Sequence, residues 1–292
     1  MASSLTSPAL TLAAQKAIIA SRPYIAKLSQ FANDFSADAV APMTTLKIAI
    51  YDGVQAKAFN EDTNNYETVD GSTKFADVTF SEFKTTFKYT EKDLTEFNNT
   101  GLWSNTGSAA GRAIGKEILT QVAGKIGIGA GHSVTLPGTL TKKSFADLRK
   151  ECATAGIDPA DCVVMLNSAT FAELLSLLDF NVYGSEDAIK NGVIPNLYGF
   201  KAVVEVNAPI VGDDGALKGI VAPGYDVIIA TKQCPNDISS AYQEFGYETD
   251  PDSGLSVNYR RHVDTATGSS YWNSVVMLGV GFAEKDKFIT LK

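Results

Sequence analysis

The sequence predicts an α+β fold, and three patterns along its 292 residues indicate this class. Residues 162–232 combine short apolar runs of strand length with one amphipathic segment of helix length. Residues 1–44 and 107–126 space their apolar side chains as helices do, whereas residues 242–291 are rich in β-prone residues. The chain is long enough for one large domain or two ordinary ones.

The central unit begins with a buried strand and a capped helix. Residues 162–166 form a short apolar run, which is typical of a buried strand. Candidate N-caps of the helix are Asn167, Ser168 and Thr170, and the first residue stays open because Thr170 and Glu173 also have capping-box spacing. One apolar face is predicted to be buried in the core: Phe171, Leu174, Leu175 and Leu178.

Three more runs of strand length complete the central unit. A tight turn is expected at 213–215, because Asp and Gly tolerate positive φ, and a break at Pro223-Gly224. The predicted strands are residues 200–206, 217–222 and 225–230.

The first 44 residues predict an arm that makes no core of its own. Its helical row is rich in Ala, which buries little surface, so the arm is expected to pack on the body or on another subunit. An interruption is expected at 21–23, because Pro23 disfavours a helix interior. The apolar row comprises Leu10, Ala13, Ala14, Ala17, Ile18 and Ile25.

Residues 45–90 predict a long two-stranded hairpin. Leu46, Ile48 and Ile50 alternate with Lys47 and Ala49, as in a half-buried strand. After a polar, turn-prone stretch, the chain returns through an aromatic, β-prone run. The apolar members of that run are Phe75, Val78, Phe80, Phe83 and Phe87.

Two further helices are predicted before the central unit. The first, 107–126, has a row at every fourth residue and glycines that permit the close approach of another backbone. The second begins at Thr141 and ends at Gly156. The apolar row of the helix at 107–126 is Ile114, Ile118, Val122 and Ile126, and its glycines include Gly111, Gly115 and Gly124. The helix that begins at Thr141 is expected to bury Phe145, Leu148 and Cys152.

Composition narrows the function classes. Hydrophobic residues make up 45% and charged residues 20% of the chain, which fits a folded protein. The formal net charge of −8 argues against tight, phosphate-driven DNA binding, although a wall that surrounds DNA is compatible with it. Cys152, Cys162 and Cys234 form no CxxC motif and are interpreted as core residues in a reducing compartment. The start lacks signal-peptide features, and the longest apolar run, 275–283, is too short to cross a bilayer.

Three segments in this order resemble the major capsid proteins of tailed bacteriophages. They are VVMLNSATFAELLSLL, then NGVIPNLYGFKAVVEVNAP, then LKGIVAPGYDVIIATK. In that family a strand and a capped helix are followed by an Ile-Pro-x-Leu-x-Gly-Phe turn into a strand, then by an Ala-Pro segment and an apolar run. With weaker pattern matches elsewhere, the resemblance covers about residues 45–292.

The resemblance implies the shared phage-capsid fold, with an N-terminal arm, an extended E-loop hairpin, a peripheral (P) domain with a long helix and a β-sheet, and an axial (A) domain. The segment KKSFADLRKECATAGIDPADCVVMLN resembles the helix that spans the P domain and runs into the A domain. The implied ranges are the arm at 1–44, the E-loop at 45–90, the P domain at 91–165 and 241–292, and the A domain at 166–240.

Catalytic and metal-binding patterns were tested against the same residues, and the sequence predicts no enzyme, cofactor or metal site. His132 and His262 lie far apart in the chain, outside HExxH or HxH settings, and are expected to be structural or solvated. The stretch 127–132 misses GxGxxG at its last position and follows a predicted helix. The stretch 250–254 is similar to the start of a calcium loop but lacks its terminal Glu, and Asp213-Asp214 is expected in a turn.

The function implied by the resemblance is assembly into an icosahedral shell around packaged double-stranded DNA, in the virion capsid after assembly in the host cytoplasm. The implied partners are further copies of the chain in capsomers and shell, a scaffold, a portal and DNA without sequence-specific binding, with no membrane. Inter-subunit contacts are expected at Tyr66, Val69 and Phe75 near the hairpin tip. The alternatives are an encapsulin-like compartment and, from another class, an intracellular β-rich enzyme or binding module.

Overall fold

The computed structural model describes residues 8–36, 44–51, 73–90, 100–136, 138–178, 192–234, 244–251 and 254–292. The helices are α1 (Pro8–Leu28), α3 (Thr100–Ile126), α4 (Lys142–Thr154) and α5 (Ser168–Leu177), with 3-10 turns η2 (Pro159–Asp161) and η4 (Lys285–Lys287). The first strands are β1 (Asn33–Asp34), β2 (Thr45–Tyr51), β3 (Thr73–Tyr89), β4 (His132–Val134), β5 (Cys162–Asn167), β6 (Val193–Pro195), β7 (Ala202–Val206) and β8 (Ile210–Gly212). The others are β9 (Gly215–Leu217), β10 (Gly219–Pro223), β11 (Val227–Lys232), β12 (Glu244–Thr249), β13 (Ser256–Asp264), β14 (Ser269–Phe282) and β15 (Ile289–Leu291).

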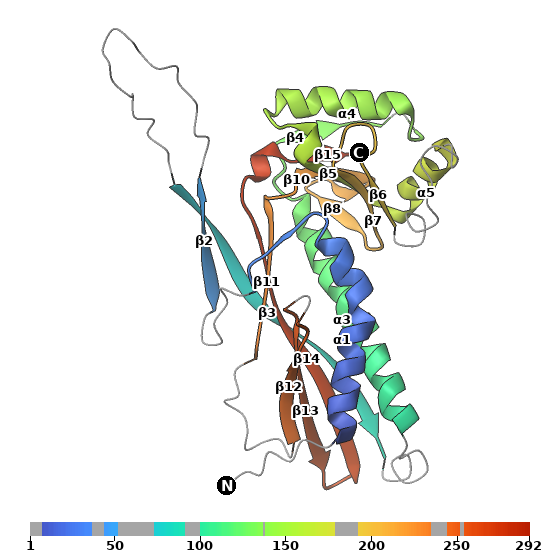
Figure 1. Ribbon diagram of the computed structural model, residues 1–292, viewed down its shortest axis with the longest axis vertical. Coiled ribbons are helices and arrows are strands. Elements are labelled where there is room, and N and C mark those ends of the chain that lie inside the picture. The colour runs from blue at the N-terminus through green and yellow to red at the C-terminus, as the bar shows by residue number, and fades with distance from the viewer. Residues whose placement is uncertain are drawn as a thin grey trace.

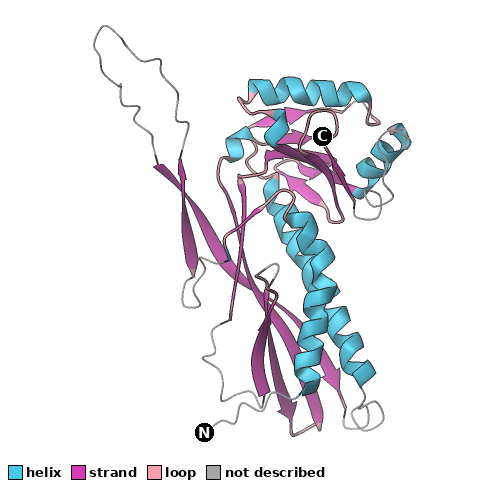
Figure 2. Ribbon diagram, viewed as in Figure 1, coloured by secondary structure: helices cyan, strands magenta, loops and turns pink. Residues whose placement is uncertain are grey.

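Two large sheets divide the described chain into two layered parts (Figure 1). The seven-stranded sheet has the order β1-β11-β14-β13-β12, and β3 pairs with the long strand β14 while β2 pairs with β3. The six-stranded sheet has the order β4-β15-β10-β5-β7-β6. Figure 2 shows that the long helices lie beside the first sheet, whereas the shorter helices surround the second.

The helices α1 and α3 run side by side along one face of the seven-stranded sheet (Figure 1). The predicted row of α3 is fully buried there, with Ile114, Ile118, Val122 and Ile126 all at 2% exposure or less. The Ala-rich face of α1 is buried against α3, so the arm packs on the body of its own chain rather than requiring another subunit. The helix continues through Pro23, contrary to the expected interruption, because a proline removes only one backbone donor and the contacts with α3 hold both sides.

The six-stranded sheet is buried on both faces. Alternate residues of β5 point to opposite sides: Val163 and Met165 join the core around α3, while Val164 and Leu166 join the core beneath α4 and α5. This two-sided burial explains why residues 162–166 form a continuous apolar run. The predicted face of α4, made by Phe145, Leu148 and Cys152, packs into the second core.

The helix caps follow the sequence closely. Thr141 caps α4 and forms a capping box with Ser144, and Gly156 takes a positive φ of 71° directly after the helix. Among the three candidates, Asn167 is the N-cap of α5, since its side chain accepts a hydrogen bond from the Thr170 amide. On the face of α5, Leu174 is fully buried but Leu175 is only half-buried, so that predicted face is narrower than expected.

Three connections join the two parts, and they meet at one place, which we call the neck: residues 127–131, 224–226 and 283–288. The Gly131 amide donates to the Lys285 carbonyl at 3.2 Å, and the Ala283 amide donates to the Asp226 carbonyl at 2.8 Å. The Lys285 ammonium donates to two carbonyls at the end of α3, those of Lys125 and Ile128. The neck therefore binds all three connections together by backbone hydrogen bonds.

The domain ranges expected from the sequence cut across this division into two sheets. The helix α4 lies in the range 91–165, yet it packs on the six-stranded sheet. The strand β15 lies in the range 241–292, yet it pairs with β10 and β4 of that same sheet. Among the described residues, no helix is long and apolar enough to cross a membrane.

Candidate functional site: a projecting hairpin and a small polar pocket

The hairpin of β2 and β3 projects from the side of the body, away from α1 and α3 (Figure 1). Its strands pair in register from Thr45↔Thr79 to Tyr51↔Thr73, as the alternation of Leu46 and Ile48 predicts. One face is anchored, because Leu46 and Val78 pack with β11 in a small core. On the neighbouring strand β14, Gly279 and Gly281 lack the side chains that would collide with Val78 of β3.

The other face of the hairpin carries an exposed aromatic residue. Phe75 is 64% exposed and pairs across the strands with exposed Ala49. Phe75 is therefore available for contact with another molecule. The other two expected contact residues, Tyr66 and Val69, lie outside the described residues.

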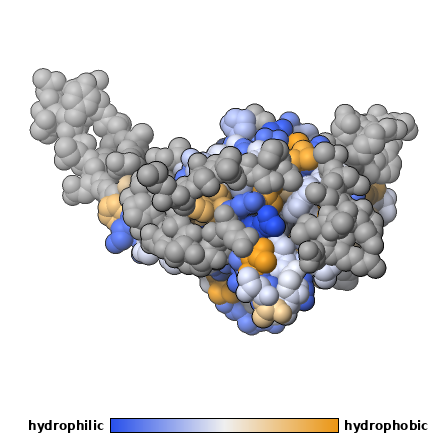
Figure 3. Space-filling model, turned by 90° about the horizontal axis from the view of Figure 1, so that it is seen from below, coloured by the Kyte–Doolittle hydropathy of each residue, from blue (hydrophilic) through white to orange (hydrophobic). Residues whose placement is uncertain are grey.

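Exposed large apolar side chains elsewhere are spread over different elements. Seen from the end below the seven-stranded sheet, the hydrophobic residues of the described surface are scattered among hydrophilic ones (Figure 3). Within the described chain, the exposed large apolar side chains are Ile19, Phe75, Ile128, Tyr225 and Tyr247. Phe75 is the most exposed of these.

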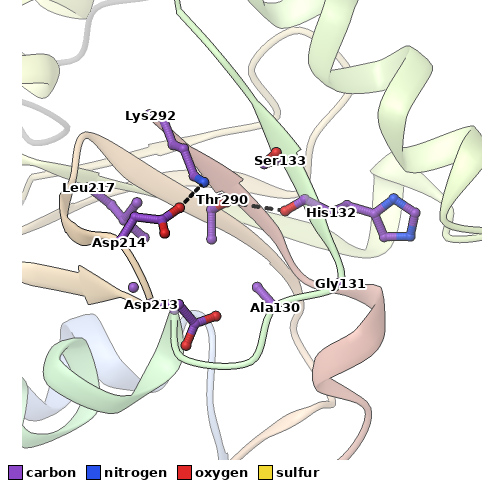
Figure 4. Close-up of a pocket in the computed structure, with 11 residues that line it drawn as sticks. Ala130, Gly131, His132, Ser133, Asp213, Asp214, Leu217, Thr290 and Lys292 are labelled. Carbon is purple, nitrogen blue, oxygen red and sulfur yellow. Dashed lines mark hydrogen bonds and ion pairs between the residues drawn. The ribbon is translucent and has the colours of Figure 1, made fainter.

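A polar pocket of about 120 Å³ lies where the end of α3 meets the β8–β9 hairpin and β15 (Figure 4). Ligand pockets typically have volumes of about 300–1,000 Å³, so this one could hold only a very small molecule. Its acidic residues make structural contacts: Asp213 accepts from the Gly129 amide at 3.1 Å, and Asp214 pairs with the Lys292 ammonium. The ion pair lowers the pKa of Asp214 below its usual value.

The two histidines are placed in separate structural contacts. The His132 ring points away from the pocket (Figure 4), and its Nδ1 lies 2.9 Å from Glu151 of α4. His262 stacks on Tyr271 across β13 and β14, with ring centroids 4.8 Å apart. Neither histidine ring faces the pocket carboxylates, so neither histidine is placed to transfer a proton in the pocket. Within the described part of the chain, no group of three or more His, Cys, Asp or Glu could hold a metal ion.

The neck holds a buried carboxylate, Asp226, whose pKa is strongly raised. Asp226 is 1% exposed and its Oδ2 has no hydrogen-bond partner, so burial raises its pKa to about 7. Buried Glu284 and the Asp286 carboxylate raise this pKa further, while the Lys287 ammonium, which pairs with Glu284, lowers it. Tyr225 lies beside Asp226, whose charge adds to burial in raising the pKa of the phenol. The sequence offered one signal for this group, an Asp inside an otherwise apolar run.

Several solved structures are similar to this chain over most of its length. A structure of Mycobacterium phage Che8 is 15% identical and has a TM-score of 0.57, over 91% of this chain and 90% of that chain. The capsid of cyanophage P-SCSP1u is 10% identical with a TM-score of 0.53, over 89% and 86% of the two chains. The capsid of a native GTA particle is 13% identical with a TM-score of 0.53, over 92% and 90%.

The chain has the phage-capsid fold. The match over about nine-tenths of both chains confirms the fold class predicted from the sequence, the α+β tailed-phage major capsid fold. No family model and no curated protein matches the chain.

Proposed function

We propose that this chain is a shell subunit that assembles with copies of itself into an icosahedral capsid around double-stranded DNA. The observation that carries the proposal is the extent of the match: phage capsid structures correspond to this chain along almost their whole length. The role that we infer is structural, in the wall of the shell, rather than catalytic.

The β2–β3 hairpin is the inter-subunit contact in this proposal. A two-stranded hairpin alone is marginally stable in water, because it buries too little surface to offset the ordering of its backbone. Contacts with a neighbouring subunit would supply that burial. Phe75 supports this role through its exposure, and we extend it to Tyr66 and Val69, which belong to the same segment.

We assign the P domain to the seven-stranded sheet with α1 and α3, and the A domain to the six-stranded sheet with α4 and α5. The sheet pairings support this partition, since each sheet has its own helices and the three connections cross only at the neck. In this assignment the N-terminal arm comprises α1 with its flanks, and the E-loop is the β2–β3 hairpin.

The further partners in the proposal are a scaffold and a portal, and the subunit assembles in the host cytoplasm before it becomes part of the virion capsid. Buried, unpaired thiols at Cys152, Cys162 and Cys234 fit assembly in a reducing compartment.

Electron microscopy of the purified full-length chain, alone and co-expressed with scaffold and portal candidates from the same genome, tests the proposal. Closed shells, rings or capsomers are the expected result. A monodisperse monomer at high protein concentration under all of these conditions would overturn it.

A further inference from the structure

The two long helices are the basic part of an acidic chain. The helix α1 carries three cations and no carboxylate, and α3 carries three cations and one carboxylate, so together they have a formal charge of +5. Since the whole chain has −8, the remaining residues carry −13. The cations are Lys16, Arg22 and Lys27 in α1 and Arg112, Lys116 and Lys125 in α3, and the carboxylate is Glu117.

Two of these six cations are neutralised by acidic partners. Arg22 pairs with buried Asp250 at 2.7 Å, and Lys27 lies 3.6 Å from Glu205. For the other four, Lys16, Arg112, Lys116 and Lys125, the described residues supply no carboxylate within ion-pair distance. Glu117, which follows Lys116 in α3 and accepts a hydrogen bond from Gln121 at 2.8 Å, contributes one opposing charge, so the outer side of the helix pair keeps a net positive charge. As far as the described residues extend, these cations are therefore available for an external anion.

The fold places Lys16 of α1 and Arg112 and Lys116 of α3 on one outer face, whereas Lys125 lies about 180° around α3 from Lys116, at the neck. Arg112 and Lys116 are exposed, whereas Ile114 and Ile118 on the opposite side of α3 are buried in the core. Gly111 of α3 contacts Ala17 of α1. Arg112 and Lys16 are the chain neighbours of these two residues, so they lie at the same height along the paired helix axes. With a helical rise of about 1.5 Å per residue, Arg112 and Lys116 are about 6 Å apart along the axis.

The residues next to Arg112 on α3 are small. Ala109 and Ala113 surround Arg112 with small side chains, which lets a phosphate backbone approach the guanidinium closely. The exposed large apolar side chain on these two helices, among the described residues, is Ile19. A folded protein partner would be expected to need an apolar interface core, which this face does not offer.

We propose that the outer face of the α1–α3 pair contacts duplex DNA through its phosphates and forms the inner lining of the shell. The inference rests on the proposed function and adds the orientation of the subunit to it. DNA presents about one negative charge per 1.7 Å of helix axis, so a row of unpaired cations binds it without reading base sequence. The acidic remainder of the chain is repelled by the same phosphates, which favours one orientation.

A matched pair of double variants tests this. Arg112→Gln with Lys116→Gln removes two charges from the proposed face. Lys84→Gln with Lys88→Gln removes two exposed charges from the opposite face of the seven-stranded sheet. Side chains alternate along β3, and Phe83 and Phe87, each one residue before a lysine, pack into the core beside the helices. Gln keeps a helix propensity close to that of Arg and Lys, and circular dichroism verifies the fold of each variant.

The readout is the salt dependence of binding between the full-length chain and a short mixed-sequence DNA duplex. Each lost phosphate contact lowers the slope of log affinity against log salt by about 0.9, so the helix variant should lose about 2 units. The sheet variant should keep the parent slope.

Three results would overturn the proposal: no DNA binding by the parent at low salt, equal slopes in the parent and the helix variant, or a loss confined to the sheet variant. If polyglutamate binds the parent and DNA does not, the face takes an acidic polypeptide and the DNA assignment is wrong. Electron microscopy of the same samples distinguishes a failure of DNA contact at this face from a failure of shell assembly. Shells with an unchanged DNA slope refute this inference alone, whereas absence of shells refutes the proposed function.

Discussion

Gly111 of α3 lies directly against Ala17 of α1. A Cβ added to Gly111 would stand 2.0 Å from the Ala17 carbonyl oxygen, and one added to Gly107 would stand 2.1 Å from the Ala13 carbonyl oxygen. The two helices thus approach backbone to backbone at glycines one helical turn apart. This contact explains how an Ala-rich arm that buries little surface by itself is fixed on the body.

Gly111→Ala should destabilise the protein, although Ala is the better helix former. The added methyl group would have to separate α1 from α3, and overpacking of this kind costs about 1–3 kcal/mol. Gly124→Ala is the matched control, because no atom lies within 4 Å of its added Cβ, and it should stabilise the helix by up to about 1 kcal/mol. Denaturant unfolding of both variants checks this. Opposite signs are expected, and a stabilised Gly111→Ala would contradict the observed packing.

Phe75→Ser should weaken shell formation and leave the free subunit stable. The side chain is 64% exposed in one chain, so its loss costs the subunit little, whereas each neighbour contact would lose about 1.5–3 kcal/mol. Ile19→Ser, at 54% exposure on α1, is the control and should assemble normally. Sedimentation and electron microscopy measure assembly, and thermal melting measures the subunit. Normal shell yield from Phe75→Ser would show that the contact lies elsewhere.

Asp226 should make the protein less stable as the pH rises. Its pKa is about 7 in the folded chain against an ordinary value of 3.8, so the folded state holds a proton that the unfolded state has lost between these pH values. Stability from this group is therefore full below about pH 4 and is lost as pH rises through about 7. At about 1.4 kcal/mol per pKa unit, the upper bound on the loss is on the order of 4 kcal/mol.

Asp226→Asn should flatten this pH profile, because Asn is neutral at every pH and close in shape to the protonated acid. The variant should match the parent near pH 4 and exceed its stability near pH 8. Asp286→Asn, which removes an exposed carboxylate of the same connection, should keep the pH-dependent loss of stability but move it to slightly lower pH, because the Asp286 charge helps to raise the pKa of Asp226. Chemical denaturation across this pH range measures the effect. A parental slope in Asp226→Asn would mean that another group titrates at the neck.

Leu174→Asp should abolish soluble folding, while Leu175→Asp should not. Leu174 is fully buried beneath α5, where an unpaired charge costs several kcal/mol, and Leu175 remains half-buried and can hydrate a carboxylate. Soluble yield and circular dichroism distinguish the two. Comparable folding of both variants would show that the face of α5 is less tightly packed than described.

Much of the local structure could be predicted because periodicity assigns residues to a face. The row of α3, the caps of α4, the continuous run of β5 and the pairing of β2 with β3 all follow from spacing within one segment. The resemblance to capsid proteins likewise gave the fold class. The continuous burial of α1 through Pro23 could not be predicted, because packing on α3 overrides a local helix breaker.

The candidate site was only partly accessible from sequence. Phe75 was expected at the hairpin and is exposed there, but its partner in a shell remains a proposal. The basic face of α1 and α3 was hidden by a whole-chain charge of −8, although counting charges for each predicted helix would have detected it.

By itself, the sequence determined the elements whose spacing is regular, such as the buried row of α3, the continuous run of β5 and the alternation of β2. Tertiary structure alone decided that Gly111 meets Ala17, that Asp226 is buried beside Glu284, and that β15 leaves the seven-stranded sheet for the six-stranded one. The physical reason is range. Helix and strand periods depend on neighbours a few residues apart, whereas these contacts join segments far apart in the chain and form only when the two layers pack.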